Sequence, residues 1–376
     1  MKFTCEKVLL QNAISTAGRA VAQKSSIPAL EGILIRASGQ ELIFSGYNMQ
    51  TGIRTRLSAN VVEEGEIVVS SRLFSEIIRK MPDDVVTFFV SERMTVHLSC
   101  GAADFEISGL SAAEYPDLPE VEDEYSIRMD RKILKEMIEE VAFAVSTNES
   151  RPIHTGALFE VADNSLTMAA VDGFRLAVRR EPLEKVEGGE FFFVAPGQAL
   201  NEVKGICGES KASGDEETSA SVTLGKRHIL FAVGNTELIC RRLEGEFLDY
   251  RNAIPKNNPI SVTVETKDLI GSIDRVSVMI SEKLKSPVRC VFDHDKILLS
   301  AKTATGDAKD ICSMTGDGGG LEIGFNNRYL MEALRYAPTD KVRIELNTSV
   351  SPALILPVED DGRFLYMVLP VRLKAN

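Results

Sequence analysis

The stretch RKILKEMIEEVAFAV at residues 131–145 decides how the chain is organised, because its apolar pattern occurs three times. Its counterparts are KVLLQNAISTAGRAV at 7–21 and TKDLIGSIDRVSVMI at 266–280, which begin 124 residues before it and 135 residues after it. Each stretch places apolar or alanine residues at positions i, i+4, i+7 and i+11, which share one helical face. These residues are Leu10, Ile14, Ala17 and Val21; Leu134, Ile138, Val141 and Val145; Leu269, Ile273, Val276 and Ile280. The pattern predicts an internal repeat of a unit that contains a helix.

The register of the repeat holds beyond this helix. Pro28, Pro152 and Pro287 each precede a β-rich run that reads as a strand, a polar turn and a second strand. Small changes in the offset mark loop insertions, the clearest being GESKASGDEETS at 208–219. A second helical stripe recurs at Phe74, Ile77 and Met81; Leu200, Val203 and Cys207; Leu330, Ala333 and Ala337.

The repeat predicts an α+β protein of three tandem units, each with two helices and several antiparallel strands. The stretches EYPDLPEVEDE and GEFLDYRNAIPKNNP are loop-like in composition and mark the two seams. The predicted domains are residues 1–124, 125–253 and 254–376. The alternative is three unrelated α+β domains whose patterns coincide by chance.

The charge balance limits how the chain can bind nucleic acid. It has 43 basic and 55 acidic residues, a net charge of −12, so its whole surface cannot grip phosphates. Any contact with DNA must be local or topological. Its apolar runs are too short to span a membrane, and polar residues interrupt the N-terminus where a signal peptide needs an apolar core, so we expect a cytoplasmic protein.

Residues suited to catalysis or metal binding are scattered. The phosphate-binding patterns G-x-G-x-x-G and G-x-x-x-x-G-K-[ST] do not occur, and His97, His154, His228 and His294 lack the spacing of metal ligands. His97 and Cys100 would point to opposite faces of a strand, which makes a nucleophile pair geometrically poor. The glycine cluster at 316–320 reads as a hairpin tip. Buried free thiols are expected at Cys5, Cys100, Cys207, Cys240, Cys290 and Cys312, which form no C-x-x-C pair.

Several landmarks of the sequence resemble those of a known family. They are MKFT, IPALEGILI, LSAAEYPDLP, AAVDGFRLAV, DYRNAIPK, IGFNNRYLMEAL and the ending YMVLPVRL. In this order, through all three repeats and essentially the full chain, they resemble bacterial DNA polymerase III beta subunits, which are sliding clamps. The resemblance implies a non-enzymatic processivity factor without cofactors. It also implies a head-to-tail dimeric ring of six clamp domains, with twelve helices around duplex DNA.

The same resemblance implies two kinds of partner. Double-stranded DNA would be contacted without sequence readout by basic residues on the polar helix faces and loops. The candidates are Lys7, Arg19, Lys24, Arg72, Arg79, Lys132, Lys135, Asn148, Arg151, Gln198, Lys204, Arg275, Arg328 and Arg335. Gln198 stands where many relatives are basic, and Glu136 and Glu139 share a helix that would face DNA, so this lining is less positive than usual. Taken singly, a basic residue is more often an ordinary solvated charge than a DNA contact, so the prediction concerns the group.

The protein partners implied by the resemblance are the polymerase III alpha subunit, the clamp loader and repair factors, which insert a short peptide into a cleft between the last two domains. Matching residues are His154, Val171, Gly173, Phe174, Arg175, Leu176, Leu248, Asn252, Ala253, Pro352, Met367, Val368, Leu369, Pro370, Val371 and Arg372. Met and Leu suit a surface that accepts several partners. Phe174, His154 and Asn252 depart from the usual residues, and 374–376 extend past the usual end. The alternative for 367–373 is an ordinary core strand.

The dimer contact is predicted from the apolar pattern. Val278 and Met279 lie off the core stripe of their helix and should contact another subunit. In the other subunit they are expected to contact Phe105 and Ile107, alternate residues on one face of an edge strand.

Two other functions stay open at this point. One is a repeat-built protein scaffold that never binds DNA. The other is an enzyme whose site is built at a domain junction around Asp172, Arg175 and His154.

Overall fold

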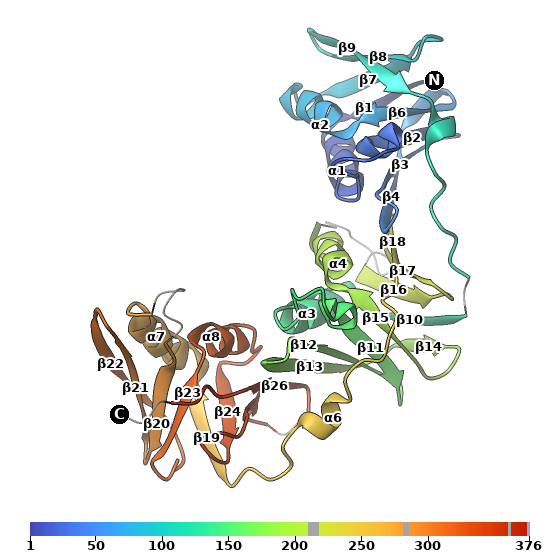
Figure 1. Cartoon of the computed structure of the whole chain (residues 1–376). Coiled ribbons are helices and arrows are strands. Elements are labelled where there is room, and N and C mark those ends of the chain that lie inside the picture. The colour runs from blue at the N-terminus through green and yellow to red at the C-terminus, as the bar shows by residue number, and fades with distance from the viewer. Residues whose placement is uncertain (123, 210–217, 281–285, 360–361, 374–376) are drawn as a thin grey trace. The chain divides into compact units, whose positions relative to one another are not determined.

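The order of helices and strands recurs three times along the chain. The structure is a computed structural model, and it describes residues 1–122, 124–209, 218–280, 286–359 and 362–373. Each repeat begins with a strand and a helix, continues with antiparallel strands, and ends with a second helix followed by three strands (Figure 1). The predicted α+β triplication is therefore confirmed. Most of the predicted insertion at 208–219 lies outside the described residues.

The N-terminal repeat contains two helices, α1 (Lys7–Gly18) and α2 (Ser71–Lys80), which pack against each other (Figure 1). Its strands are β1 (Lys2–Glu6), β2 (Gly32–Ser38), β3 (Glu41–Tyr47), β4 (Thr51–Ser58), β5 (Asn60–Glu63), β6 (Gly65–Ser70), β7 (Val85–Val90), β8 (Thr95–Cys100) and β9 (Ala103–Leu110). Short 3-10 turns, η1 (Pro28–Glu31) and η2 (Ala112–Glu114), precede β2 and follow β9.

The middle repeat contains α3 (Arg131–Ala142), α4 (Gly197–Glu209) and the short α6 (Tyr250–Ala253). Its strands are β10 (Tyr125–Asp130), β11 (Gly156–Ala162), β12 (Ser165–Val171), β13 (Arg175–Pro182), β14 (Lys185–Glu187), β15 (Phe191–Pro196), β16 (Ser219–Leu224), β17 (His228–Val233) and β18 (Thr236–Arg241). The turn η3 (Pro152–Thr155) stands before β11, as η1 stands before β2.

The C-terminal repeat contains α7 (Thr266–Ser277) and α8 (Asn327–Arg335), which also pack side by side. Its strands are β19 (Ile260–Glu265), β20 (Val288–Asp293), β21 (Lys296–Thr303), β22 (Gly306–Ser313), β23 (Leu321–Phe325), β24 (Lys341–Leu346), β25 (Ala353–Pro357) and β26 (Phe364–Val368).

The polar turns predicted after each repeated proline are hairpin turns. Gly39 joins β2 to β3 with φ +60°, Asp163 and Asn164 join β11 to β12 with φ +51° and +52°, and His294 joins β20 to β21 with φ +46°. Positive φ matches the right-handed twist of the flanking strands, and Gly, Asn and Asp adopt it most readily. A two-residue hairpin turn therefore joins the first two strands after the repeated proline in all three repeats.

The predicted helical stripes form the inner faces of the helices. The first three positions of each first-helix stripe are buried, at Leu10, Ile14 and Ala17, and at their counterparts in α3 and α7. The fourth position was wrong as a helix residue, because the helices end at Gly18, Ala142 and Ser277. Val21, Val145 and Ile280 are half-buried residues of the following turns.

The strands belong to two compact bodies of structure. In the first, β18 of the middle repeat pairs with β4 of the N-terminal repeat, inside the sheet order β14-β10-β16-β17-β18-β4-β3-β2-β6-β9-β8-β7-β1-β5. In the second, β13 pairs with β26 of the C-terminal repeat, inside the order β15-β11-β12-β13-β26-β25-β24-β19. A further sheet there has the order β22-β21-β20-β23. Consecutive repeats thus share a continuous sheet.

The six thiols are buried and form no disulfide, as the sequence predicted. Burial raises the pKa of Cys240 and of Cys290 to about 12, which keeps both protonated near neutral pH. Across the described ranges, helices fall short of the length and apolarity needed to cross a membrane.

Candidate functional site

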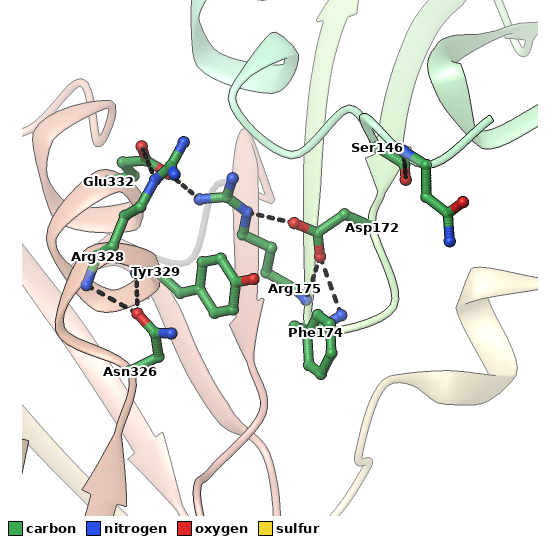
Figure 2. Close-up of polar contacts among 9 residues, drawn as sticks. Ser146, Asp172, Phe174, Arg175, Asn326, Arg328, Tyr329 and Glu332 are labelled. Atoms are coloured by element: carbon green, nitrogen blue, oxygen red, sulfur yellow. Dashed lines mark hydrogen bonds and ion pairs between the residues drawn. The ribbon is translucent and has the colours of Figure 1, made fainter. Parts of the chain in front are cut away.

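Arg175, at the start of β13, is the centre of an ion-pair network between the middle and C-terminal repeats. Its side chain is 6% exposed. Its Nε donates to Asp172 Oδ2 at 2.9 Å, and its Nη1 donates to Glu332 of α8 (Figure 2). The guanidinium carbon also lies 4.7 Å from the ring centroid of Tyr329. A buried cation held on three sides keeps one orientation, because its partners satisfy it only there.

Glu332 is shared between this buried arginine and an exposed one. Arg328, one helical turn earlier on α8, donates from Nε to Glu332 Oε1 at 3.1 Å (Figure 2). Asn326 caps the same helix by accepting from the backbone N–H groups of Arg328 and Tyr329. The predicted DNA-contacting Arg328 and the predicted peptide-contacting Arg175 therefore meet on one carboxylate.

Phe174 lies exposed beside this network. Asp172 Oδ1 accepts from the backbone N–H of Phe174 at 2.9 Å, and Gly173 between them has φ +90°, which favours glycine. The Phe174 ring stacks on Tyr329 with 5.7 Å between centroids and is still 56% exposed (Figure 2). An aromatic ring fixed in place but open to solvent is a typical anchor of a binding surface.

An apolar cluster on one face of the sheet joins many of the predicted cleft residues. Val171 of β12, Leu176 of β13 and Met367 of β26 belong to it, because these three strands are neighbours. Phe247 packs against the cluster and contacts the ring of His154 edge to face. Burial, and then the charge of Arg151, lower the pKa of His154, so it is neutral near pH 7. Its role here is packing.

The other predicted cleft residues divide between surface and core. Leu369 donates its backbone N–H to Phe174 at 2.9 Å, which places the C-terminal strip beside the exposed ring. Val368 is fully buried, so the core-strand reading holds for that residue. Exposed members are Leu248, Asn252, Ala253 and Arg372; half-buried members are Pro352, Leu369, Pro370 and Val371.

Four residues of the site were not identified from the sequence. Tyr329 and Glu332 lie about 150 residues from Arg175 along the chain, and only the pairing of β13 with β26 brings α8 near. Phe143 stacks on Tyr336 and lies 5.3 Å from the Arg175 guanidinium. Phe247 directly precedes the predicted Leu248 in the sequence.

The basic residues predicted to face DNA are mostly exposed, but several meet a carboxylate. Intramolecular pairs join Lys7 to Asp83 (2.7 Å), Arg275 to Asp310 (2.5 Å), Arg19 to Glu202 (3.8 Å) and Arg335 to Asp274 (4.0 Å). Among the described residues, Lys24, Arg72, Arg79 and Lys132 are exposed. Asn148 shapes the turn before exposed Arg151 by accepting from the Ser150 N–H; Gln198 is exposed and Lys204 and Lys135 are half-buried.

The predicted dimer residues lie at two sheet edges. Phe105 and Ile107 share one face of β9, and among the described residues the span Ala103–Ser108 of this strand pairs only with β8. Val278 and Met279 were wrongly placed on a helix face, because α7 ends at Ser277. Val278 caps the helix and is 82% exposed, whereas the Met279 methyl packs closely against Gly306 of the edge strand β22.

The enzyme alternative finds little support in this geometry. Asp172 is committed to Arg175 and to two backbone N–H groups, and His154 packs on Phe247. His97 is half-exposed on β8 while Cys100 is buried, so the two point apart. Within the described ranges, acidic, His and Cys side chains form no group able to hold a metal ion.

Comparison with known proteins agrees with the triplication. Models of the DNA polymerase III beta subunit match each repeat in turn: the N-terminal domain at residues 1–119, the central domain at 128–249 and the C-terminal domain at 251–372. Fold and site thus define a protein of three tandem clamp domains. The chain belongs to the DNA polymerase III beta subunit family.

Similar proteins cover the whole chain. The beta sliding clamps of Staphylococcus epidermidis and Staphylococcus aureus are 31% and 30% identical over 382 aligned residues, with 99% of each chain covered. Among solved structures, the DNA polymerase sliding clamp of Bacillus subtilis has 29% identity and a TM-score of 0.93 over 100% of both chains. The beta subunit of Thermotoga maritima has 26% identity and a TM-score of 0.90, covering 99% of this chain and 100% of its own.

Proposed function

We propose that the chain is a DNA sliding clamp, a non-catalytic processivity subunit that encircles duplex DNA and tethers the replicative polymerase and other factors. The observation that carries the proposal is the threefold clamp repeat, matched along its whole length by the beta subunit family. A scaffold that never binds DNA is not favoured. We propose 1–124, 125–253 and 254–376 as the domain limits, since β10 begins at Tyr125 and α6 ends at Ala253.

Ring closure would join two copies head to tail. The support is a pair of free sheet edges: β9 over Ala103–Ser108 and β22 at the end of its sheet. Free edges present unpaired backbone groups that a second chain can pair with. The exposed Val278 and Phe105 would add apolar contact, and a heterologous contact of this kind closes after two copies.

Retention on DNA would come from the closed ring. With a net charge of −12, and with several lining arginines paired to carboxylates, the protein holds phosphates weakly. Weak contact without base readout permits sliding, while a closed link prevents sideways escape. The basic set named above, with Asn148 and Gln198, is the proposed DNA-facing surface.

Partner proteins would dock on the Phe174 surface, which we define as Phe174, Leu248, Leu369, Val371 and the apolar cluster beneath them. Its exposed apolar side chains next to the fixed Arg175 suit an extended peptide with apolar anchors. The polymerase alpha subunit and the clamp loader are the proposed clients.

Electron microscopy of single particles tests the proposal. A closed ring of two chains with a hole at least as wide as duplex DNA is the expected image. Compact monomers, or oligomers without a hole, at micromolar concentration would rule out a clamp.

A further inference from the structure

The first body of structure carries a second copy of the apolar surface that lies beneath Phe174. Strand pairs β2–β3 and β11–β12 stand in the same register, 124 residues apart. Leu34 and Ser45 therefore correspond to Leu158 and Ala169, which belong to the cluster of the proposed peptide site. All four residues are buried.

The adjoining strands of the two surfaces correspond as well. Gly52 of β4 and Leu176 of β13 occupy the same position in their repeats. Ile239 of β18 lies opposite Gly52, and Met367 of β26 lies opposite Leu176. One strand further, Leu230 lies opposite Ile239 as Leu354 lies opposite Met367. The N-terminal and middle repeats thus reproduce the sheet face that the middle and C-terminal repeats use.

A cavity lies over the sheet face that carries Leu34, Leu230 and Ile239, and we call this cavity the hollow. This cavity of about 700 Å³ lies between the sheet and the connecting segment 116–121. The apolar part of its sheet wall is formed by Leu34, Ile43, Leu230 and Ile239, and its other wall includes Leu118. A cavity of this size holds several apolar side chains of an extended peptide.

The charges around the hollow distinguish it from the Phe174 surface. Arg36 and Arg54 line it, whereas Glu160 and Val178 occupy the corresponding positions in the second copy. Arg36 Nε donates to Glu66 at 2.9 Å, Arg54 pairs with Glu237, and Glu120 also lines the hollow. Arg36 meets Asp117 of the connecting segment at 3.7 Å, and that carboxylate is 93% exposed. A ligand carboxylate can replace Asp117 there, because an exposed pair at this distance is weak.

We propose that this hollow is a second docking site, for a short extended peptide with an acidic residue beside its apolar anchors. The inference rests on the proposed function in one respect, since it assigns the same class of ligand as the Phe174 surface. The acidic preference is particular to the first site.

The test selects peptides on a protein whose other site is disabled. Random eight-residue peptides displayed on phage are selected on the double variant Phe174→Ala with Leu369→Ala, and the enriched peptides are titrated with a fluorescein label by anisotropy. Enrichment of Asp or Glu beside Leu, Ile or Phe is expected. Adding Leu230→Glu should weaken binding at least about 10-fold, because it places a charge in the apolar wall and repels the acidic residue of the peptide.

Two further variants guard against a folding defect. Val62→Glu introduces the same charge at an exposed residue of β5, outside the hollow, and should leave binding unchanged. Asp117→Asn removes the competing carboxylate from an exposed position and should tighten binding about 3- to 10-fold. If no peptide is enriched, or if binding of the enriched peptides is unchanged by both Leu230→Glu and Asp117→Asn, the site does not exist. Peptides selected on the native chain and sensitive only to Phe174→Ala and Leu369→Ala would support the proposed function and contradict the second site.

Discussion

At the scale of single residues, the proposed peptide surface depends on side chains held by polar contacts yet open to solvent. Phe174 is fixed by Asp172 through its backbone and by Tyr329 through its ring. Leu369 is tied to Phe174 by a backbone hydrogen bond. Because these side chains are already ordered, binding a peptide costs less conformational entropy.

Replacing Phe174 and Leu369 together with alanine should weaken a partner peptide about 10- to 100-fold. The two side chains supply anchoring area worth a few kcal/mol at a hot spot. Fluorescence anisotropy with a labelled clamp-binding peptide measures the change, with the dimer state as the control for folding. Unchanged affinity in a folded double variant would show that partners dock elsewhere.

Glu332→Gln should destabilise the protein through Arg175. The buried guanidinium would keep Asp172 but lose the second carboxylate, at a cost of about 1–3 kcal/mol. Thermal unfolding should therefore begin at a lower temperature. Glu322→Gln is the matched control. Glu322 forms an ion pair with Arg289 at the surface, and losing such a pair should change the unfolding temperature little. Equal melting of both variants would show that the shared carboxylate has no structural role.

The sequence could supply part of this site. Arg175, Phe174 and the C-terminal strip were identified by resemblance to a family, and Val171, Leu176 and Met367 do share one cluster. Tyr329 and Glu332 stand in the landmark IGFNNRYLMEAL, but their contact with Arg175 could not be predicted, because no local pattern records which helix a paired strand brings near. Whether a basic residue is free to contact DNA could not be predicted either, because it depends on carboxylates of other elements, such as Asp310, which pairs with Arg275.

At the scale of elements, helix ends and strand edges decide the proposed ring contact. The apolar spacing identified the buried helix faces, but it overran each first helix by several residues, because turns after the helix also bury apolar side chains. Val278 and Met279 consequently lie on a turn beside the edge strand β22.

The double change Val278→Asp with Met279→Asp should convert the dimer into monomers. Two carboxylates would be buried without partners in the proposed contact. Multi-angle light scattering reports the mass directly, and Val350→Asp, at another exposed apolar residue of the same repeat, should stay dimeric. A stable dimer of the double variant would remove this turn from the interface.

A buried carboxylate on α3 makes stability depend on pH. Burial raises the pKa of Glu140 to about 7, with the charges of Glu136 and Glu181 adding to the rise and Arg179 opposing it. The folded state thus holds this proton more tightly than the unfolded chain does. The stability contributed by Glu140 is fully present below about pH 4.5 and is lost as the pH rises through about 7.

Glu140→Gln should flatten this dependence, since glutamine mimics the protonated carboxyl at every pH. Urea unfolding between pH 5 and 7.5 should show the native chain losing stability relative to the variant. A constant difference across that range would mean that Glu140 does not titrate there.

At the scale of the whole molecule, triplication explains the protein better than any single motif does. The repeat could be recognised in the sequence because the helix stripes and the prolines recur at nearly constant spacings. The sequence could not predict that neighbouring repeats share a sheet, because pairings such as β4 with β18 join strands about 180 residues apart. That sharing creates two equivalent faces, of which the Phe174 surface is one.

Retention on circular DNA tests the central claim most directly. Protein loaded by a clamp loader onto a nicked circle is separated from free protein by gel filtration in salt high enough to screen phosphate contacts. Because the ring is linked to the circle, it should stay bound there and should dissociate once a restriction enzyme linearises the DNA. Loss from the intact circle in high salt, or persistent binding to linear DNA with free ends, would contradict a sliding clamp.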